Sequence, residues 1–496
     1  MSTLAEMNDP FNKQRSLSLP SIFSDHMVLQ RNKTITVWGL SKQKQVIKVN
    51  LKDNNTIIAS NTSEIDEQGK WHVTLPAQQA GGPFSLRIKQ GSEQIEVNDV
   101  LIGDIWLASG QSNMEWKLNW QVDDWQEEVA NSLNPNIRFF EIAKQYHAIP
   151  PALLRQGQWN IASPETTGEF SAVAWHFAKR YQQHTGIPLA IIDSTWGGTP
   201  AEAWTSLEAL QYVPGYRDSA LDMLENTQQW QQVFSDIEAL EQQNQPLNSK
   251  HEPTSYKWKP GVLFNGMIHP LIHFPINGVI WYQGENNVGA NAIYSDLFKA
   301  LIKDWRAQWQ TPDLPFLFVQ LASYLQQKNH VQNSDWARLR EAQASALTLP
   351  YTGMAVTIDI GDANDIHPRN KAEVGERLWR IAQHMVLQEN VSYSGPVMQQ
   401  VQPQKIAGKN VLVVSYKHID GGLQVKGDQL AGFAIASTDG KFVHAQATIQ
   451  DNKVIVSAPK IKQPVSLRYG WADNSPANLY NLAGLPALPF CYIQED

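Results

Sequence analysis

Five short apolar runs, separated by helical patterns, constrain the fold of this chain more than any other feature of its sequence. The runs cover residues 105–108, 189–192, 278–282, 316–319 and 354–358. Each is apolar on both faces, as are the strands of a parallel sheet that helices cover. Helical patterns occur between and after the runs, over residues 172–184, 294–309, 334–347 and 371–387. This alternation predicts a three-layer α/β domain whose ligands bind beyond the carboxyl ends of the strands.

The sequence on both sides of this region follows a different pattern, in which short alternating strands are separated by polar turns. Residues 17–98 predict a small β-sandwich, and residues 392–496 predict a second small β-domain. We expect a tail over residues 1–16 and a catalytic domain over 99–391. Within that domain, a glutamine-rich and mostly helical stretch at about 206–260 predicts an insertion, which serves either as a lid or as packing.

The charge balance and the single cysteine exclude several classes of protein. The chain has 40 basic and 48 acidic residues and no Lys/Arg block, so we expect neither a nucleic-acid nor a membrane partner. Cys491, standing alone, excludes an internal disulfide and a cysteine-based zinc site. Residues 1–16 have no apolar signal core, so we expect a cytoplasmic protein, or a periplasmic or secreted one if a signal was removed. No feature indicates the oligomeric state.

The loop after the first run places a serine in a tight glycine turn, within Gly110-Gln111-Ser112-Asn113-Met114. A serine at such a turn exposes its hydroxyl group and offers its own backbone N–H, as a nucleophile in acyl transfer requires. Capping of the following helix would explain Ser112 equally well. Met114 stands where the common nucleophile elbow has its second glycine, which disfavours the α/β-hydrolase fold.

Two further strand ends carry hydrogen-bond donors. The second run is followed by Gly197-Gly198, whose amides can approach a substrate oxygen closely, although a plain turn has the same composition. The third run is followed by Gln283 and Glu285, which supply a side-chain amide and a carboxylate. The amide of Gln283 could donate to an oxyanion, or satisfy the loop backbone.

The loop after the fifth run contains a histidine fixed before a proline, His367, with Asp365 two residues before it. A histidine is a suitable general base, and a carboxylate can hold its tautomer. An alternative is a metal loop built from Asp359, Asp362, Asp365 and His367, but their spacing matches no standard metal loop, and we expect no metal. Because all these loops leave the same edge of one predicted sheet, we interpret them together as an acyl-transfer site.

Taken together, these strings resemble the sialate O-acetylesterase family of SGNH hydrolases. The resemblance rests on Gly110-Gln111-Ser112-Asn113-Met114, Trp196-Gly197-Gly198-Thr199, Trp281-Tyr282-Gln283-Gly284-Glu285 and Asp365-Ile366-His367-Pro368, with further blocks at residues 23–31, 263–268 and 468–473. It implies a flavodoxin-like SGNH three-layer core with flanking β-sandwich domains. It also implies a serine esterase that removes acetyl groups from a carbohydrate through an acyl-enzyme and needs no cofactor.

The resemblance assigns roles to individual residues. Ser112 would be the nucleophile and His367 the base, and the oxyanion donors would be the amides of Ser112 and Gly198 and the side chain of Gln283. Further loops would contact the substrate, through Trp116, Trp196, Tyr282, Glu285 and Asn265.

The third member of the triad departs from the general SGNH pattern. That pattern has an aspartate three residues before the histidine, where this chain has Asn364. Asp365, a backbone carbonyl or Glu285 would then orient the imidazole.

The substrate and two other classes of function stay open. A sialic acid carries a carboxylate and would favour a nearby Arg or Lys, whereas a neutral xylan-type glycan would favour aromatic platforms. No basic residue stands out near the motifs, while the chain has 18 tryptophans, so the sequence slightly favours the plant-type glycan. The alternatives are a non-catalytic carbohydrate-binding protein and a glycoside hydrolase with Glu115 and Glu285 as its carboxylates.

Overall fold

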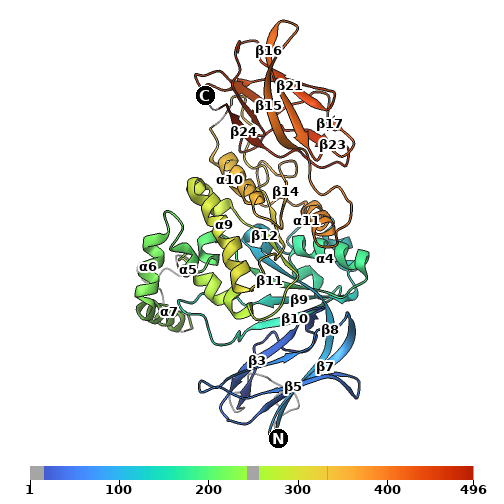
Figure 1. The fold of residues 1–496 in the computed structure, drawn as a ribbon, viewed down its shortest axis with the longest axis vertical. Coiled ribbons are helices and arrows are strands. Elements are labelled where there is room, and N and C mark those ends of the chain that lie inside the picture. The colour runs from blue at the N-terminus through green and yellow to red at the C-terminus, as the bar shows by residue number, and fades with distance from the viewer. Residues whose placement is uncertain (1–15, 243–255, 332, 495–496) are drawn as a thin grey trace. The chain divides into compact units, whose positions relative to one another are not determined.

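The computed structural model describes residues 16–242, 256–331 and 333–494, which form a mixed α/β protein with several sheets (Figure 1). The chain divides into two compact units, residues 1–280 with 300–314 and residues 281–299 with 315–496. Strand β12 (Gly278–Tyr282) and helix α9 (Asn291–Gln308) pass from one unit into the other. Both elements confirm runs that the sequence predicts.

The first unit begins with antiparallel strands whose alternate side chains are buried, as the period-two pattern of the sequence predicts. One sheet has β3 (Ile35–Ser41) between β1 (Leu17–Ser18) and β6 (Lys70–Leu75). Another has β4 (Ile47–Asp53) between β5 (Thr56–Ser63) and β7 (Gly81–Gln90). β7 pairs in turn with the first half of β8 (Glu93–Gly110), and the short β2 (Val28–Gln30) runs parallel to β8.

Strand β8 continues through the expected boundary at residue 98 into a parallel sheet. β11 (Leu189–Thr195) runs parallel to its second half, and β9 (Asn134–Ile142) runs parallel to β11. β10 (Gly157–Ala162) is antiparallel to β9. The sequence did not predict β9 and β10, because polar residues interrupt their apolar pattern. Asn277 N–H donates to Ile105 O at 2.7 Å, which places the start of β12 beside β8.

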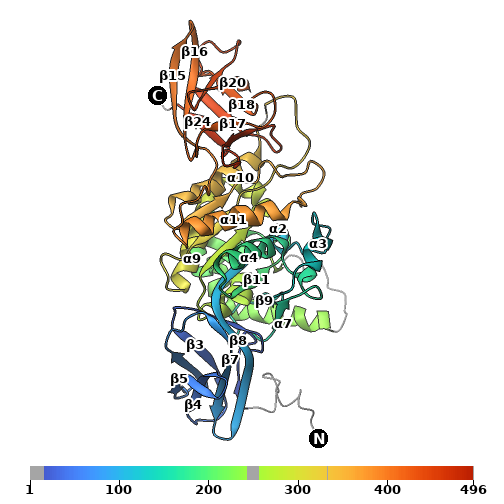
Figure 2. The same ribbon diagram turned by 90° about the vertical axis from the view of Figure 1, so that its right-hand side faces the viewer.

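Helices cover this sheet and form the insertion. α4 (Ala172–Thr185) packs on β9 and β11 (Figure 2) and begins at the capping side chain of Ser171. The predicted insertion contains α5 (Leu207–Leu210), α6 (Arg217–Glu225) and α7 (Thr227–Gln242). Its residues 243–255 lie outside the described part of the chain.

The second unit contains the last two predicted strands and the helices after them. β13 (Phe316–Val319) and β14 (Thr352–Ala355) are parallel. Capping side chains, Ser334 and Asn370, begin α10 (Asp335–Ala344) and α11 (Lys371–Met385). The expected strand over 354–358 starts earlier and ends at Ala355, because the carbonyl of the next residue, Val356, accepts a hydrogen bond from the side chain of Arg377.

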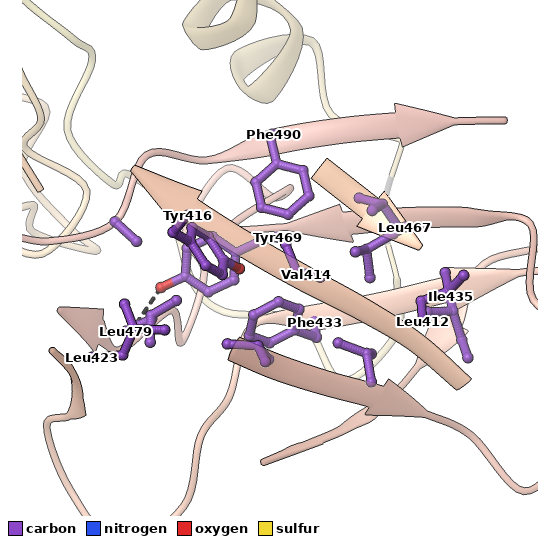
Figure 3. Packing of buried hydrophobic residues seen from close by; sticks show 14 of the residues in the cluster. Leu412, Val414, Tyr416, Leu423, Phe433, Ile435, Leu467, Tyr469, Leu479 and Phe490 are labelled. Atoms are coloured by element: carbon purple, nitrogen blue, oxygen red, sulfur yellow. Dashed lines mark hydrogen bonds between the residues drawn. The ribbon is translucent and has the colours of Figure 1, made fainter. Parts of the chain in front are cut away.

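The remainder of this unit is an array of antiparallel strands, as the sequence predicts. One sheet has the order β15 (Val397–Ile406), β16 (Lys409–Lys417), β21 (Lys453–Ser457), β20 (Gln446–Gln450). Another has the order β19 (Val443–His444), β18 (Phe433–Ala436), β22 (Ser466–Tyr469), β24 (Phe490–Ile493). β17 (Leu423–Val425) pairs with β23 (Leu479–Asn481). Buried aromatic rings meet in the core that these sheets share, where the ring centres of Phe433 and Tyr469 lie 4.6 Å apart (Figure 3). The Tyr469 hydroxyl accepts a hydrogen bond from Leu479 N–H.

Candidate active site

The predicted nucleophile lies at the end of β8. Gly110, the last residue of β8, has a φ of 132°, which favours glycine, and it leads the chain into the short helix α2 (Ser112–Glu115). Gln111 occupies the N-cap position in an extended conformation, and Ser112 is the first helical residue. The helix-cap explanation of Ser112 is therefore wrong, since another residue stands at the cap.

The glycine loop after β11 lies against Ser112. Thr195 pairs with Gly110 in the parallel register, and Trp196 N–H donates to Gly110 O at 3.1 Å. A Cβ atom at Gly197 would lie only 3.3 Å from Ser112 Cβ, and Gly198 has a φ of 69°. The first glycine permits the close approach and the second permits the left-handed turn.

Charged side chains surround Gly197. Glu115, at the end of α2, accepts a hydrogen bond from Gly197 N–H and pairs with Lys144. Lys257 Nζ donates to Gly197 O at 3.0 Å and lies 5.4 Å from the centre of the Trp196 ring. The expectation that no basic residue marks the site therefore missed two lysines. Both are remote from the motifs in sequence, and no sequence signal identifies them.

The predicted substrate contacts of this unit differ in their surroundings. Trp116 and Trp196 are both half-buried, and Trp116 Nε1 donates to Trp120 O at 2.9 Å. Asn265 is buried, and its amide nitrogen donates to the backbone carbonyls of residues 147–148 at 3.1 and 2.8 Å. Asn265 thus holds the neighbouring loop, which commits its amide hydrogens to the backbone.

The loop after β12 belongs to the second unit and fixes Gln283. This side chain is fully buried, its amide nitrogen donates to Asn287 Oδ1 at 2.7 Å, and its amide oxygen accepts from Tyr294 Oη at 2.9 Å. These two bonds set the plane of the amide. Glu285 follows at the start of η5 (Glu285–Ala290) and is partly exposed. Tyr282 is 1% exposed, so its ring has too little free surface to stack on a sugar.

His367 and Asp365 lie together in the loop before α11. Asp365 Oδ1 accepts the backbone N–H of His367 at 2.8 Å and lies 3.4 Å from His367 Nδ1. Its other oxygen pairs with Arg369 at 2.9 Å. Burial and the positive charge of Lys371 lower the pKa of His367, although Asp365 opposes them. An imidazole with a lowered pKa is neutral at pH 7 and can accept a proton.

The basic residues beside His367 also escaped the sequence-based expectation. Lys371 is fully buried, with its Nζ 5.7 Å from the centre of the Tyr282 ring. Burial lowers the pKa of Lys371 to about 7, against the attraction of Glu285 and Asp365. Arg369 directly follows the His367-Pro368 pair in the sequence, and Lys371 comes two residues later. This closeness in sequence could have predicted basic residues beside His367.

Asp359, the first member of the alternative metal loop, is bound by other groups. Arg377 reaches its two oxygens at 2.6 and 2.8 Å, and Tyr480 Oη donates to it at 3.0 Å. Burial would raise the pKa of Asp359, but these hydrogen bonds lower it below its usual value. Within residues 16–242, 256–331 and 333–494, no three His, Cys, Asp or Glu side chains gather as a metal site requires.

The two units share the predicted residues between them. Ser112 lies with the glycine loop in the first unit, whereas Gln283 and the pair Asp365 and His367 belong to the second. Each unit thus brings together part of the predicted set, the predicted nucleophile beside the glycine loop and the predicted base beside a carboxylate. Among the described helices, none is both long and apolar enough to span a bilayer.

Comparisons with known proteins indicate the family of this chain. A family model described as carbohydrate esterase, sialic acid-specific acetylesterase, matches residues 253–384. The rat sialate O-acetylesterase is 31% identical over 77% of this chain and 76% of its own length, and the human one is 29% identical over 96% and 92%. The crystal structure of a carbohydrate acetylesterase from Xanthomonas citri is 38% identical, with a TM-score of 0.83 over 96% of this chain and 99% of that one.

These similarities define the class first. The chain is a carbohydrate esterase, an enzyme that hydrolyses carboxylic esters. More specifically, it belongs to the sialate O-acetylesterase family.

Proposed function

We propose that this enzyme removes O-acetyl groups from a carbohydrate through an acetyl-enzyme formed on Ser112. The observation that carries the proposal is the close approach of the Gly197-Gly198 loop to Ser112, since a nucleophile needs amide donors beside it. The names of its relatives, sialate O-acetylesterases, support an O-acetylated sialic acid as the substrate. An acetylated xylan-type glycan is the alternative, which the many tryptophans of the sequence favour.

In the proposed mechanism, His367 takes the proton of Ser112 as its oxygen attacks the acetyl carbonyl carbon. The negative oxygen of the tetrahedral intermediate accepts hydrogen bonds from the amides of Ser112 and Gly198 and from the side chain of Gln283. His367 then gives its proton to the departing sugar oxygen. In the second half of the reaction, water loses a proton to His367 as it attacks the acetyl carbon, and His367 returns that proton to Ser112 Oγ as acetate leaves. Asp365 orients the imidazole, since its carboxylate lies beside Nδ1. These steps require neither a metal nor a cofactor.

We further propose that the parallel strands and their helices form a flavodoxin-like three-layer core over residues 99–391, between β-sandwich domains over 17–98 and 392–496. The partly exposed Trp116, Trp196 and Glu285 are the proposed substrate contacts. Asn265 and Tyr282 support them from buried positions.

The experiment compares Ser112, the first residue of α2, with Ser109, which lies near the end of β8. Ser112→Ala should reduce hydrolysis of 4-nitrophenyl acetate by about a thousandfold or more and abolish labelling by a serine-directed organophosphate. Ser109→Ala is the matched control, because Ser109 is buried and its hydroxyl has no hydrogen-bond partner among the described residues. Full activity of folded Ser112→Ala would refute the proposal. Acetate release from acetylated xylan and from 9-O-acetylated sialic acid then identifies the substrate.

A further inference from the structure

Lys257 contacts the peptide group whose N–H is the proposed oxyanion donor. The carbonyl of Gly197 and the N–H of Gly198 belong to one planar peptide unit. Lys257 Nζ donates to that carbonyl oxygen at 3.0 Å. A positive charge therefore lies at the acceptor end of the peptide, opposite the N–H that would face the substrate oxygen.

The preceding peptide group is held by an acid. Gly197 N–H donates to Glu115, which also pairs with Lys144. Glu115 is the last residue of the same four-residue helix that Ser112 begins. Charged side chains thus fix both peptide groups of Gly197, and one of these side chains belongs to the helix of the nucleophile.

The position of Lys257 is itself constrained. The side chain is partly buried, and its ammonium group lies 5.4 Å from the centre of the Trp196 ring, within the range of a cation–π contact. Burial and the positive charge of Lys144 lower the pKa of Lys257, and Glu115 opposes them. The structure therefore directs this ammonium group at a backbone carbonyl and an indole face, an arrangement that a solubilising surface lysine does not need.

We propose that Lys257 is a positioning residue of the oxyanion site, which fixes and polarises the Gly197–Gly198 peptide so that the Gly198 N–H donates more strongly. The inference rests on the proposed role of Gly198 in the function above. Charge-assisted hydrogen bonds are stronger than neutral ones, and hydrogen bonds in a chain strengthen one another. Because negative charge develops on the substrate oxygen only in the transition state, the effect belongs in kcat and not in KM.

Three variants test this role on 4-nitrophenyl acetate, a neutral ester. Lys257→Met removes both the donor and the charge, whereas Lys257→Gln keeps a donor without the charge. We expect Lys257→Met to lower kcat by about tenfold with KM within about twofold, because the N–H itself remains and losing a whole donor costs about 10²- to 10³-fold. The kcat of Lys257→Gln should lie between those of Lys257→Met and the unaltered enzyme. The control is Lys259→Met, since Lys259 lies over the Trp230 ring at 5.1 Å and should leave the kinetics unchanged.

A second readout separates polarisation from a purely structural role. An alkylboronic acid adds to a catalytic serine as a tetrahedral anion, so its affinity should fall in Lys257→Met by the same factor as kcat. The affinity for acetate, which is not tetrahedral, should stay within about twofold. Unchanged kcat and boronic-acid affinity in folded Lys257→Met would overturn the proposal.

Another outcome would overturn it in favour of substrate binding. If Lys257→Met raised KM for 9-O-acetylated sialic acid and left the aryl ester kinetics unchanged, Lys257 would bind the carboxylate of the sugar.

The Ser112→Ala variant distinguishes failure of the proposed function from failure of the role proposed for Lys257. Activity retained in that variant rejects the proposed function itself, whereas its loss together with unchanged Lys257→Met rejects only the role of Lys257.

Discussion

Replacing Asp193 by asparagine is expected to stabilise the protein at neutral pH. Asp193 lies on β11, is 8% exposed, and accepts a hydrogen bond from Thr195 Oγ1 at 2.7 Å. Burial, together with the negative charges of Glu141 and Glu115, raises the pKa of this carboxyl group to about 7. Asparagine has the same shape, can accept the same hydrogen bond, and carries no charge to bury.

The sign and size of the effect follow from the proton balance. In the unfolded chain Asp193 loses its proton near pH 3.8, whereas in the folded protein it keeps the proton until about pH 7. Between these two pH values the folded state binds more protons than the unfolded state. Ionisation of Asp193 therefore lowers the free energy of unfolding by about 1.4 kcal/mol for each unit by which the pH rises. Over the whole range between the two pKa values, the free energy of unfolding falls by about 4 kcal/mol at most. Asp193→Asn should match the wild type below pH 4 and exceed it increasingly up to pH 7.

Urea denaturation of both proteins at a series of pH values from 4 to 8 measures this difference. The control is Asp218→Asn, an exposed aspartate of α6, whose substitution should change the free energy of unfolding by less than about 0.5 kcal/mol. A stability difference for Asp193→Asn that is constant with pH, or negative at pH 7, would refute the reasoning.

Further predictions concern other buried charges. Lys371→Met should raise the pKa of His367, because a like charge is removed, and should shift the acidic limb of kcat/KM to higher pH. Burial lowers the pKa of His176 to about 4, so the wild type should lose stability as the pH falls from 6.5 to 4, and His176→Gln should remove that loss in urea titrations. Arg340 is fully buried and donates to four backbone carbonyls at 2.7–3.0 Å, so Arg340→Met should cost about 3 kcal/mol or more and lower Tm, whereas the exposed Arg338→Met should change Tm little.

Each of these predictions has a result that contradicts it. An acidic limb that stays in place in Lys371→Met means that this lysine does not tune the base. Equal acid sensitivity of His176→Gln and the wild type would assign the loss to other groups. A Tm in Arg340→Met equal to that of Arg338→Met would show that the four carbonyls find other donors.

The sequence predicted the elements whose signal is local. Four of the five apolar runs lie wholly within strands, and the fifth begins within β14. The helical patterns correspond to α4, α9, α10 and α11, because period and capping act over a few residues. β9 escaped prediction because buried Arg138 interrupts its apolar run. The partners of that arginine include the carbonyl of His26 and the carbonyl and carboxylate of Asp99, which are far away in the sequence. A buried polar residue with distant partners leaves no local pattern.

For the candidate site the same division holds. The sequence by itself determined which residue types stand at the strand ends, and thus indicated Ser112, the glycine pair and His367, since a motif is a property of neighbouring residues. The tertiary structure alone decided that Lys257 meets the carbonyl of Gly197, and that burial beside Glu141 sets the pKa of Asp193. Hydrogen bonds and charge interactions depend on distances in space, and such distances between residues far apart in the chain exist only once it has folded.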